Sequence, residues 1–324
     1  MPTDATRLSE PAIRPDVTCS IGITTRNRPD SLVRCVASLA SFGDLVREII
    51  IVDDSSDVPV EPAFDRLPPA LRQKIVFIPQ TGHRGYIVAR NAIMRRATSE
   101  YVLLLDDDTC VMNPEPIRSA LELIDASPNV AAVACAQAEA DGTPWPASMQ
   151  PSPVSYACYV PTFIGFAHLL RRRVFLDLGG YRESFHFYGE EKDYCLRVTN
   201  ASYDIVYVPD ALVAHLPDPS GRSETRFLRY VIRNDCFCAL YNEPFPMPVV
   251  TVPMRLIRYV SMRRHGGVND SGGLRWIVGE LLRMAPGVLR DRTPLRWTTI
   301  RRWRRLRRSW PAFERDLKWS IAQR

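Results

Sequence analysis

Short apolar runs, separated by polar segments, recur along the first 140 residues of the chain. Such runs predict buried strands when they are short and do not alternate, here at residues 17–24, 48–52, 74–78, 101–105 and 130–136. Helices are predicted between several of them, at residues 29–41, 85–97 and 114–126, the first from apolar side chains that share one face. Strands and helices that alternate in this way predict an α/β fold, a mostly parallel, doubly wound sheet flanked by helices.

The remaining segments differ in composition from this alternating part. Residues 1–15 are polar and contain proline, which predicts a flexible N-terminal arm. A loop rich in Pro, Ser and Gly is expected from about 140 to 160, and short strands and helices over 161–240 should complete the domain. We therefore expect one folded domain at 16–245, followed by a helical, Arg- and Trp-rich C-terminal extension at 246–324.

The composition is that of an ordinary globular protein, with 46% hydrophobic and 24% charged residues. The eight cysteines form no C-x-x-C pair and no cluster with zinc-ligand spacing, so reduced, cytosolic thiols are the simplest account. The N-terminus lacks the apolar region of a signal peptide, and no run of 18 apolar residues predicts a membrane span. These features predict a cytoplasmic protein.

The positive charge is concentrated at the C-terminus. Residues 290–324 hold twelve Lys and Arg against three Asp and Glu, within a chain of net charge +6. Ile300, Trp303, Leu306 and Trp310 are spaced to share one helical face. Such a basic helix could contact the inner face of the membrane peripherally, or it could pack on the main domain with its basic face in water. No nucleic-acid reader motif accompanies it, so specific nucleic-acid binding is not expected.

Three consecutive carboxylates follow the apolar run 101–105. Asp106, Asp107 and Asp108 should lie where this strand emerges, because an ionised Asp inside a buried strand would cost several kcal/mol. The carboxyl ends of strands in an open α/β sheet are where ligands bind. Asp side chains at positions i and i+2 could face one divalent cation, and oxygen ligands favour Mg²⁺ or Mn²⁺. The alternative is a solvated turn or a helix cap.

A second acidic pair, Asp53 and Asp54, follows the strand at 48–52 and should lie at the same edge of the sheet. Between the two clusters, residues 82–85 (Gly-His-Arg-Gly) precede a predicted helix, whose N-terminus favours an anion. The segment 24–28 after the first strand is Thr-Thr-Arg-Asn-Arg and holds neither G-x-G-x-x-G nor a P-loop. This argues against a dinucleotide-binding fold and against a P-loop enzyme.

In their order and spacing, these motifs resemble the family 2 glycosyltransferases of the GT-A fold, including its rhamnosyltransferases. The resemblance extends from about residue 17 to residue 242. It is carried by residues 24–29 (Thr-Thr-Arg-Asn-Arg-Pro), 51–56 (Ile-Val-Asp-Asp-Ser-Ser), Gly85, Arg90, Asn91, 105–108 (Leu-Asp-Asp-Asp), 178–181 (Leu-Gly-Gly-Tyr), 189–197 (Gly-Glu-Glu-Lys-Asp-Tyr-Cys-Leu-Arg), His215, Arg233 and Asn234.

The resemblance implies a nucleotide-sugar donor, UDP- or dTDP-linked, and a bound Mn²⁺ or Mg²⁺. Asp53 and Asp54 would contact the base. In the D-x-D motif, Asp106 would face the ribose, Asp108 would bind the metal, and His215 would complete the metal–diphosphate site, with Asp106 as a further metal ligand. The remaining donor-binding residues would be Thr24, Arg26, Gly85, Arg90, Asn91 and Asp107.

In the family, the catalytic base lies in a Glu-Asp pair, which here is Glu190-Glu191. An acceptor hydroxyl needs a carboxylate to take its proton as the new bond forms, and either glutamate could do this. Asp193 would support the pair. One base and one metal-bound leaving group on opposite faces imply a single displacement that inverts the anomeric carbon.

The acceptor side is expected between residues 145 and 190. Trp145 could stack on a sugar ring or fill the core, and Gly179 and Gly180 would form a turn that frames the pocket. The acceptor could be a glycan, a lipid-linked molecule or a small natural product. Two alternatives remain open: a phosphotransferase that uses the Asp106 strand end, although Cys110 departs from its motif, and a non-catalytic sugar-binding relative.

Overall fold

A computed structural model describes residues 17–217 and 223–314 of the chain. The predicted arm at 1–15 and Trp319 of the basic tail lie outside the described residues. All eight cysteines lie within them, and all are unpaired.

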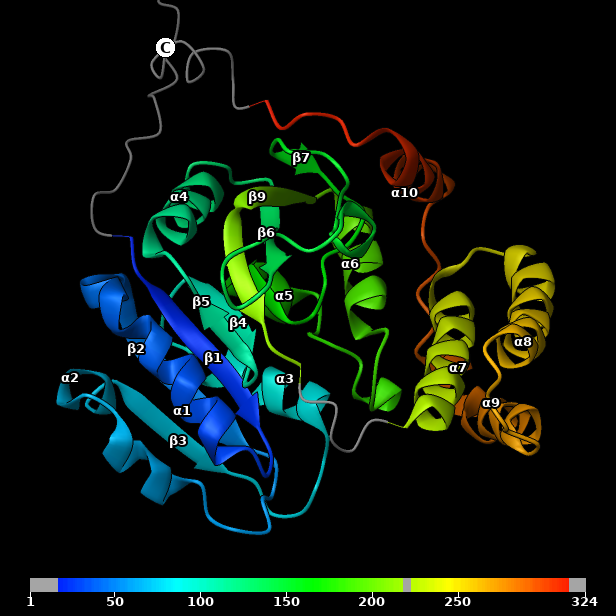
Figure 1. The fold of residues 1–324 in the computed structure, drawn as a ribbon. Helices are drawn as coiled ribbons and strands as arrows, with labels where there is room; N and C mark the ends of the chain where they lie inside the picture. The colour runs from blue at the N-terminus through cyan, green and yellow to red at the C-terminus, as the bar shows by residue number, and fades with distance from the viewer. Residues whose placement is uncertain (1–16, 218–222, 315–324) are drawn as a thin grey trace, which may run out of the picture.

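The strands and helices alternate along the first half of the chain, and helices dominate after residue 223 (Figure 1). The strands are β1 (Cys19–Thr25), β2 (Val46–Asp53), β3 (Ile75–Pro79), β4 (Tyr101–Asp106), β5 (Thr109–Val111), β6 (Val130–Ala138), β7 (Cys158–Tyr159), β8 (Ala167–Arg171) and β9 (Asp204–His215). The helices are α1 (Pro29–Ala37), α2 (Pro69–Arg72), α3 (Tyr86–Arg96), α4 (Pro114–Asp125), α5 (Arg172–Asp177), α6 (Glu190–Asn200), α7 (Glu224–Asn242), α8 (Met247–His265), α9 (Gly273–Arg290) and α10 (Trp297–Ser309). The five predicted strands and three predicted helices are all present, most with ends within two residues.

The strands form one mixed sheet in the order β3-β2-β1-β4-β8-β6-β9-β5, and β7 pairs with β9. The four strands β1 to β4 are parallel, as predicted. β8 is antiparallel to both β4 and β6, so the sheet changes direction at its centre. The predicted α/β sheet is therefore confirmed, with an antiparallel strand inserted between β4 and β6.

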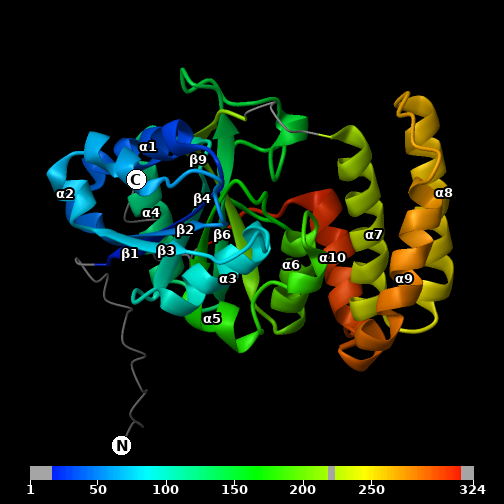
Figure 2. The same cartoon turned by 90° about the horizontal axis from the view of Figure 1, so that it is seen from below.

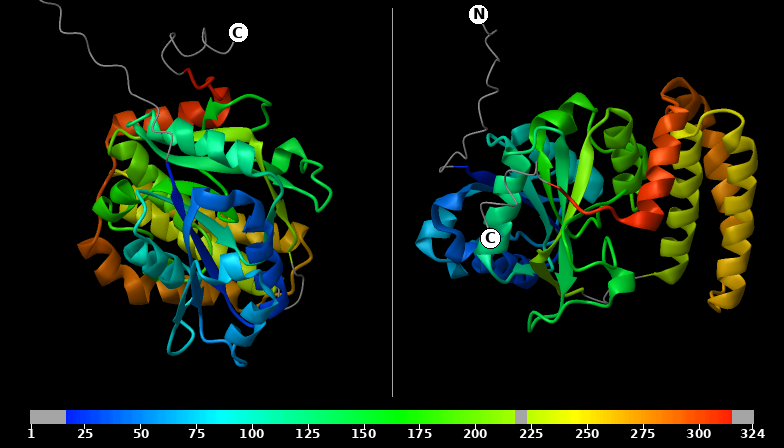
Figure 3. Two further views of the ribbon diagram at one scale, coloured as in Figure 1. Left: turned by 90° about the vertical axis from the view of Figure 1, so that its left-hand side faces the viewer. Right: turned by 90° about the horizontal axis from the view of Figure 1, so that it is seen from above.

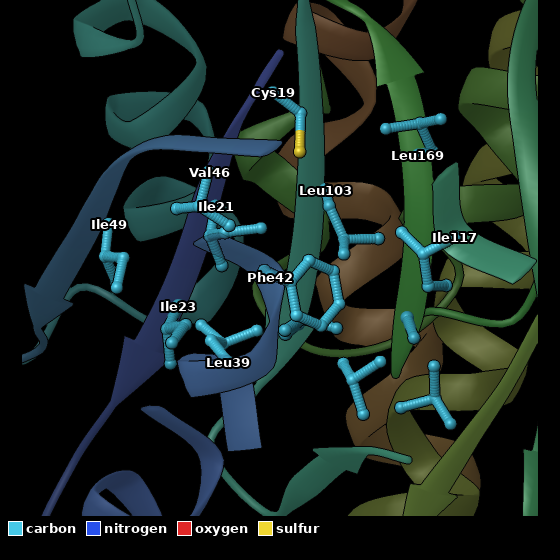
Figure 4. Close-up of a cluster of buried hydrophobic side chains, with 14 of the residues drawn as sticks. Cys19, Ile21, Ile23, Leu39, Phe42, Val46, Ile49, Leu103, Ile117 and Leu169 are labelled. Atoms are coloured by element: carbon cyan, nitrogen blue, oxygen red, sulfur yellow. The ribbon is translucent and has the colours of Figure 1, made fainter. Parts of the chain in front are cut away.

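Helices cover both faces of the sheet (Figures 1 and 2). On one face, α1 and α4 pack on apolar side chains of β1, β2 and β4; Figure 4 shows Ile21, Leu103, Phe42 and Ile117 meeting there. On the other face, α3, α5 and α6 pack on a second apolar cluster. Strands buried on both faces need apolar side chains at successive positions, which explains the continuous apolar runs.

The C-terminal helices form a separate layer beside the sheet (Figure 3). α8 and α9 pack on α7 around a small core that includes Ile232, Tyr259 and Ile277. α10 then returns to α6: Ile300 and Leu306 are buried, and Lys192 of α6 lies over the Trp303 ring. The apolar side of α10 therefore packs on the main domain, and several of its arginines, such as Arg301, Arg304 and Arg308, are exposed.

Exposed apolar side chains remain on α8 and α9 and in the turn that precedes α8. They are Phe245, Val249, Val250, Met254, Ile257, Leu274, Val278, Leu282 and Leu289. Among the described residues, no helix is both long enough and apolar enough to cross a membrane.

Candidate active site

The predicted polar positions meet at the carboxyl ends of the parallel strands. In the sheet register, Thr24 of β1 pairs with Asp106 of β4, and Thr25 pairs with Asp53 of β2. Because three neighbouring strands end at one level, their terminal side chains share one edge. Arg26, just beyond β1, is exposed, and its Nε lies 3.4 Å from the carbonyl oxygen of Ser55.

Asp106, Asp108 and His215 come together at this edge. One ligand atom of each lies within 4.8 Å of the others. The antiparallel pairing of β5 with β9 places Thr109 opposite His215, which brings the histidine beside Asp108. Its Nε2 is 3.6 Å from Oδ1 of Asp108, a buried oxygen without a hydrogen-bond donor among the described residues. Two carboxylates and an imidazole fit Mn²⁺ or Mg²⁺, so the trio is the candidate metal site.

The ring of His215 is fixed on three sides. Its Nδ1 donates a hydrogen bond to Oε1 of Gln137, 2.9 Å away, so Nε2 is the ring nitrogen that faces Asp108. Trp145 and Phe166 stack on the ring, with centroids 5.4 and 5.2 Å from that of the histidine. A partner on the second nitrogen is the usual way in which a metal-binding histidine is oriented. Trp145, predicted on the acceptor side, thus lies against the histidine of the candidate metal site.

Asp107 points away from this trio. Its carboxylate accepts hydrogen bonds from Thr25 Oγ1 at 2.8 Å and from Arg28 at 3.2 Å. Burial raises the pKa of Asp107 to about 7, although Arg28 opposes the shift. Arg28 also contacts Asp108 at 3.3 Å. Asp107 and Arg28 therefore tie the segment after β1 to the end of β4.

The pair after β2 shapes the loop that precedes α3. Asp53 accepts hydrogen bonds from Ser56, in its own turn. Asp54 accepts from the backbone N–H groups of Arg84 and Gly85 at 2.7 and 2.9 Å. Gly85 adopts φ +91°, a value that favours glycine. Both carboxylates are buried at the sheet edge where the donor base is expected.

Arg90 of α3 links the strand end to the predicted catalytic pair. One of its terminal nitrogens lies 2.6 Å from Oδ1 of Asp106, and the other lies 2.9 Å from Oε1 of Glu190. The side chain is 4% exposed. Burial would lower the pKa of this guanidinium, but the charges of Asp106 and Glu190 raise it, so Arg90 stays charged. It therefore sets the spacing between the D-x-D strand and α6.

The two glutamates differ in their surroundings. Glu190 is fully buried, with Oε1 on Arg90 and Oε2 accepting from the Tyr86 hydroxyl at 3.1 Å. Glu191 is partly exposed, and its carboxylate lies against Gly165. Burial and the charge of Glu191 hold the pKa of Glu190 well above its usual value, and burial also raises the pKa of Glu191. Glu190 is thus enclosed by Arg90 and Tyr86, whereas Glu191 is the more exposed of the two carboxylates.

Asp193 holds the catalytic helix in place. Its carboxylate is fully buried and pairs with Arg182 at 3.2 Å and with Arg197 at 2.9 Å. Asn242 donates a further hydrogen bond to it at 2.7 Å. Arg197 also donates to the carbonyl oxygen of Gly180. These contacts make Asp193 a positioning residue that joins α6 to the 178–182 turn and to the end of α7.

The predicted turn at Gly179 and Gly180 is present, with φ of +79° and +68°. Asn91, predicted to bind donor, donates to the carbonyl oxygen of Tyr181 at 2.9 Å and accepts from its backbone N–H at 3.0 Å. An added Cβ on Gly180 would lie 2.9 Å from Oδ1 of Asn91 and 3.0 Å from the Phe175 ring. The structure therefore gives Asn91 and Gly180 the contacts of a buried structural turn.

Several residues that line or brace the site were not predicted from the sequence as functional. They are Thr25, Arg28, Tyr86, Gln137 and Gly165. Arg28 lies in the segment 24–29 that resembles the family, so its positive charge beside a strand end could have indicated a role at the site. Gln137 and Gly165 had no comparable signal, since their roles depend on side chains more than 20 residues away in the chain.

Comparison with known proteins agrees with this geometry. Residues 20–186 match the sequence model described as glycosyl transferase family 2, about half of the chain. The chain belongs to glycosyl transferase family 2. The family membership predicted from the motifs is thereby confirmed, and β4 lies within the matched residues.

Two curated relatives of this family 2 protein bear glycosyltransferase names. The pre-mycofactocin glycosyltransferase of Mycobacterium tuberculosis is 31% identical over 218 residues, which cover 62% of this chain and 42% of the relative. The uncharacterized glycosyltransferase YwdF of Bacillus subtilis is 26% identical over 218 residues, with 64% and 76% covered. The chain thus spans about two-fifths of the length of the mycobacterial relative.

Solved structures share the fold of this family 2 protein at low sequence identity. The mannosyltransferase PcManGT from Pyrobaculum calidifontis, in complex with GDP-Man and Mn²⁺, superposes with a TM-score of 0.56 at 17% identity, over 92% of this chain and 86% of that one. TarS 1–349 of S. aureus, in complex with UDP-GlcNAc, gives 0.59 at 16% identity, over 84% and 82%. The predicted GT-A type of fold is therefore confirmed.

Proposed function

We propose that this chain transfers a hexosyl or deoxyhexosyl group from a nucleoside-diphosphate sugar to an acceptor hydroxyl, with inversion and with a divalent cation. The observation that carries the proposal is the convergence of Asp106, Asp108 and His215 within 4.8 Å. Arg90 connects this trio to the glutamate pair of α6 through Asp106 and Glu190. A leaving-group site and a base therefore belong to one connected arrangement.

Asp108, His215 and Asp106 would hold the Mn²⁺ or Mg²⁺. The bound ion would neutralise the charge that develops on the departing nucleoside diphosphate. The oriented Nε2 of His215 and the partnerless Oδ1 of Asp108 fit this role. Because Arg28 and Arg90 already contact Asp108 and Asp106, both ligands are held in place before a donor binds.

Glu191 would act as the base. It is the less enclosed of the two glutamates and would take the acceptor proton as the hydroxyl oxygen bonds to the anomeric carbon. Glu190, bonded to Arg90 and Tyr86, would keep α6 in register with β4. A single displacement with one base inverts the anomeric configuration.

The donor is proposed to be UDP- or dTDP-linked. Asp53 and Asp54 lie where the base would enter, and Thr24 and Arg26 border the same edge. The acceptor could belong to cell-surface glycan or natural-product glycoside synthesis. TarS in complex with UDP-GlcNAc supports a uridine donor, whereas PcManGT in complex with GDP-Man makes a guanosine donor the competing outcome.

A donor panel tests the function. The full chain would be incubated with UDP-, dTDP- and GDP-sugars and Mn²⁺, and nucleotide release and product mass would be measured. Release from one nucleotide class, lost with chelator and restored by Mn²⁺ or Mg²⁺, is expected. Proton NMR of the product then reports the anomeric configuration. Phosphate release from simple phosphate esters without nucleotide-dependent transfer would instead favour the phosphotransferase alternative.

We further propose peripheral contact with the inner face of the cytoplasmic membrane. The apolar side of α10 is packed on α6, so that surface is not offered to lipid. The support comes instead from the exposed apolar residues of α8, such as Val250 and Ile257, beside Arg258 and Arg264. Apolar side chains flanked by arginines suit an anionic lipid surface.

A further inference from the structure

A cavity of about 650 Å³ lies outside the metal site, among α6, α7, α8 and α10. Its size is that of a small-molecule site. Gly189 and Lys192, which flank the glutamate pair in sequence, line it, and so do Pro161 and Thr162, shortly before the Gly165 that contacts Glu191. The cavity therefore lies beside the start of α6, and its lining includes the residues on either side of the glutamate pair in sequence.

The lining of this cavity is strongly basic. Four cationic side chains face one carboxylate: Lys192, Arg255, Arg258 and Arg307 against Asp235. Burial would raise the pKa of Asp235, but Lys192 and Arg255 outweigh it and lower the pKa, so the carboxylate is ionised. Even with Glu243, which pairs with Arg255 at the edge of the cavity, two carboxylates face four cations. An excess of positive charge in a partly enclosed space attracts an anionic ligand.

Part of this charge is structural. Lys192 and Arg255 both contact Asp235, and Arg255 also pairs with Glu243 at 2.8 Å, which joins α6, α7 and α8. Arg258 reaches Asp235 only at 3.9 Å, and its side chain is 59% exposed. Cations that pair with carboxylates between helices must be distinguished from cations that are open to a ligand, because an ion-pair network between helices needs no ligand.

Two hydrogen-bond donors at the cavity have no such structural partner. Within residues 17–217 and 223–314, Arg307 has no carboxylate partner, and its guanidinium lies 5.0 Å from the centroid of the Trp303 ring. The indole Nε1 of Trp303 is buried and finds no acceptor among the same residues. The Trp303 N–H is enclosed by its surroundings, whereas Arg307 is exposed at the cavity and can meet a ligand. Phosphate oxygens accept from arginine in the bidentate geometry that suits this cation.

The cavity continues into a second one of about 330 Å³. Pro161, Thr162 and Arg307 line both, so Arg307 stands between them. The second cavity follows the loop around Gln150, whose side chain bonds to Gln137, the residue that orients His215. The two cavities together form a groove with Arg307 at its centre. This groove borders α6 on one side and, on the other, the loop around Gln150 beside the candidate metal site.

We propose that the cavity bounded by Lys192, Arg258 and Arg307 binds a phosphate group carried by the sugar acceptor. This inference rests on the proposed transfer function, because it assigns the acceptor class of the same site. Arg258 and Arg307 supply the donors, and the acceptor extends from them past Gly189 toward Glu191. Met254, which lines the cavity and is 61% exposed, connects it to the apolar surface of α8.

The test is calorimetric and uses the full chain saturated with UDP and Mn²⁺, so that the donor site is filled. The probes are octyl phosphate, glycerol 3-phosphate and the neutral octyl glucoside. We expect saturable binding of octyl phosphate and none of octyl glucoside. Equal binding of both phosphates would indicate recognition of the phosphate alone, whereas binding of octyl phosphate only would indicate a lipid-borne one.

The double substitution Arg258→Gln/Arg307→Gln should weaken phosphate binding by about tenfold or more. This is the effect expected when hydrogen bonds to a charged group are lost. The control is Arg264→Gln/Arg308→Gln, which removes equal charge from exposed positions of the same two helices outside the cavity. Equal loss in the control, or no phosphate binding by the wild type, overturns the inference. UDP–Mn²⁺ affinity and donor turnover, measured in parallel, report separately on the proposed function.

Discussion

At the scale of single residues, the site separates two glutamates that are neighbours in sequence. Glu191→Gln should lower kcat by about 10²–10⁴-fold, because the acceptor proton then has no carboxylate to receive it. Affinity for UDP and Mn²⁺, measured by calorimetry, should be retained, since Glu191 is not one of the three candidate metal ligands. Glu190→Gln should instead lower the melting temperature, because Arg90 loses a charged partner. Full transfer by both variants would contradict the assignment.

The pH dependence of transfer follows from the same residue. Burial raises the pKa of Glu191, so this carboxyl keeps its proton to a higher pH than an exposed glutamate. A base must be unprotonated, and kcat/KM should therefore rise with pH through a midpoint above the ordinary range of glutamate. UDP–Mn²⁺ affinity is measured at each pH in parallel, so that a change in donor binding can be separated from titration of the base. If the residual activity of Glu191→Gln rose with pH through the same midpoint, the pH dependence would belong to another group.

The histidine of the metal trio offers a graded test. His215→Ala removes a ligand atom and should abolish most of the Mn²⁺-dependent gain in UDP affinity. Gln137→Ala leaves the ligand but frees its ring, and should weaken Mn²⁺ affinity by about 10–100-fold, as is usual for such outer partners. Calorimetric titration of Mn²⁺ into the UDP-bound protein measures both. Wild-type affinity in His215→Ala would remove the residue from the metal site.

At the scale of elements, glycine positions show where the backbone must stay close to the site. A Cβ on Gly165 would lie 2.2 Å from Oε1 of Glu191. Gly165→Ala should therefore displace the base and lower kcat by about a hundredfold, the usual cost of a misplacement near 1 Å. In α9, Gly279 has open space around its Cβ position. Gly279→Ala should keep activity and raise the free energy of unfolding by about 0.5–1 kcal/mol, as denaturant melts would show. Equal activity in the two variants would contradict the placement of Glu191.

The sequence was sufficient for elements whose signal is local. The continuous apolar run of β4 located the strand and placed Asp106 at its end, because burial forbids charge inside it. The position of β8 between β4 and β6 had no such signal, since antiparallel insertion depends on pairing between distant segments. The contact of Gln137 with His215 and the stacking of Trp145 on His215 also join distant segments, so the sequence did not predict them. The choice between Glu190 and Glu191 likewise required Arg90 and Tyr86, about 100 residues earlier.

At the scale of the whole molecule, the C-terminal helices separate two surfaces that the sequence could not distinguish. Apolar spacing in α10 suggested a membrane face, but Ile300 and Leu306 are buried on the main domain. The outward apolar side chains belong to α8 and α9. Amphipathicity alone shows that a face is covered, and only the packing of the whole chain shows what covers it.

Binding to lipid vesicles tests which surface meets a membrane. The full chain should co-sediment with phosphatidylglycerol vesicles and weakly with phosphatidylcholine vesicles, because arginines flank the apolar residues of α8. Ile257 is 68% exposed on α8, and Val58 is 74% exposed on a distant loop. Ile257→Asp should lower vesicle affinity by about tenfold or more, the value of burying one aliphatic side chain plus the added repulsion. Val58→Asp, an equal change in charge, should leave it unchanged. Equal losses in both variants would mean that net charge, rather than the α8 surface, determines the binding.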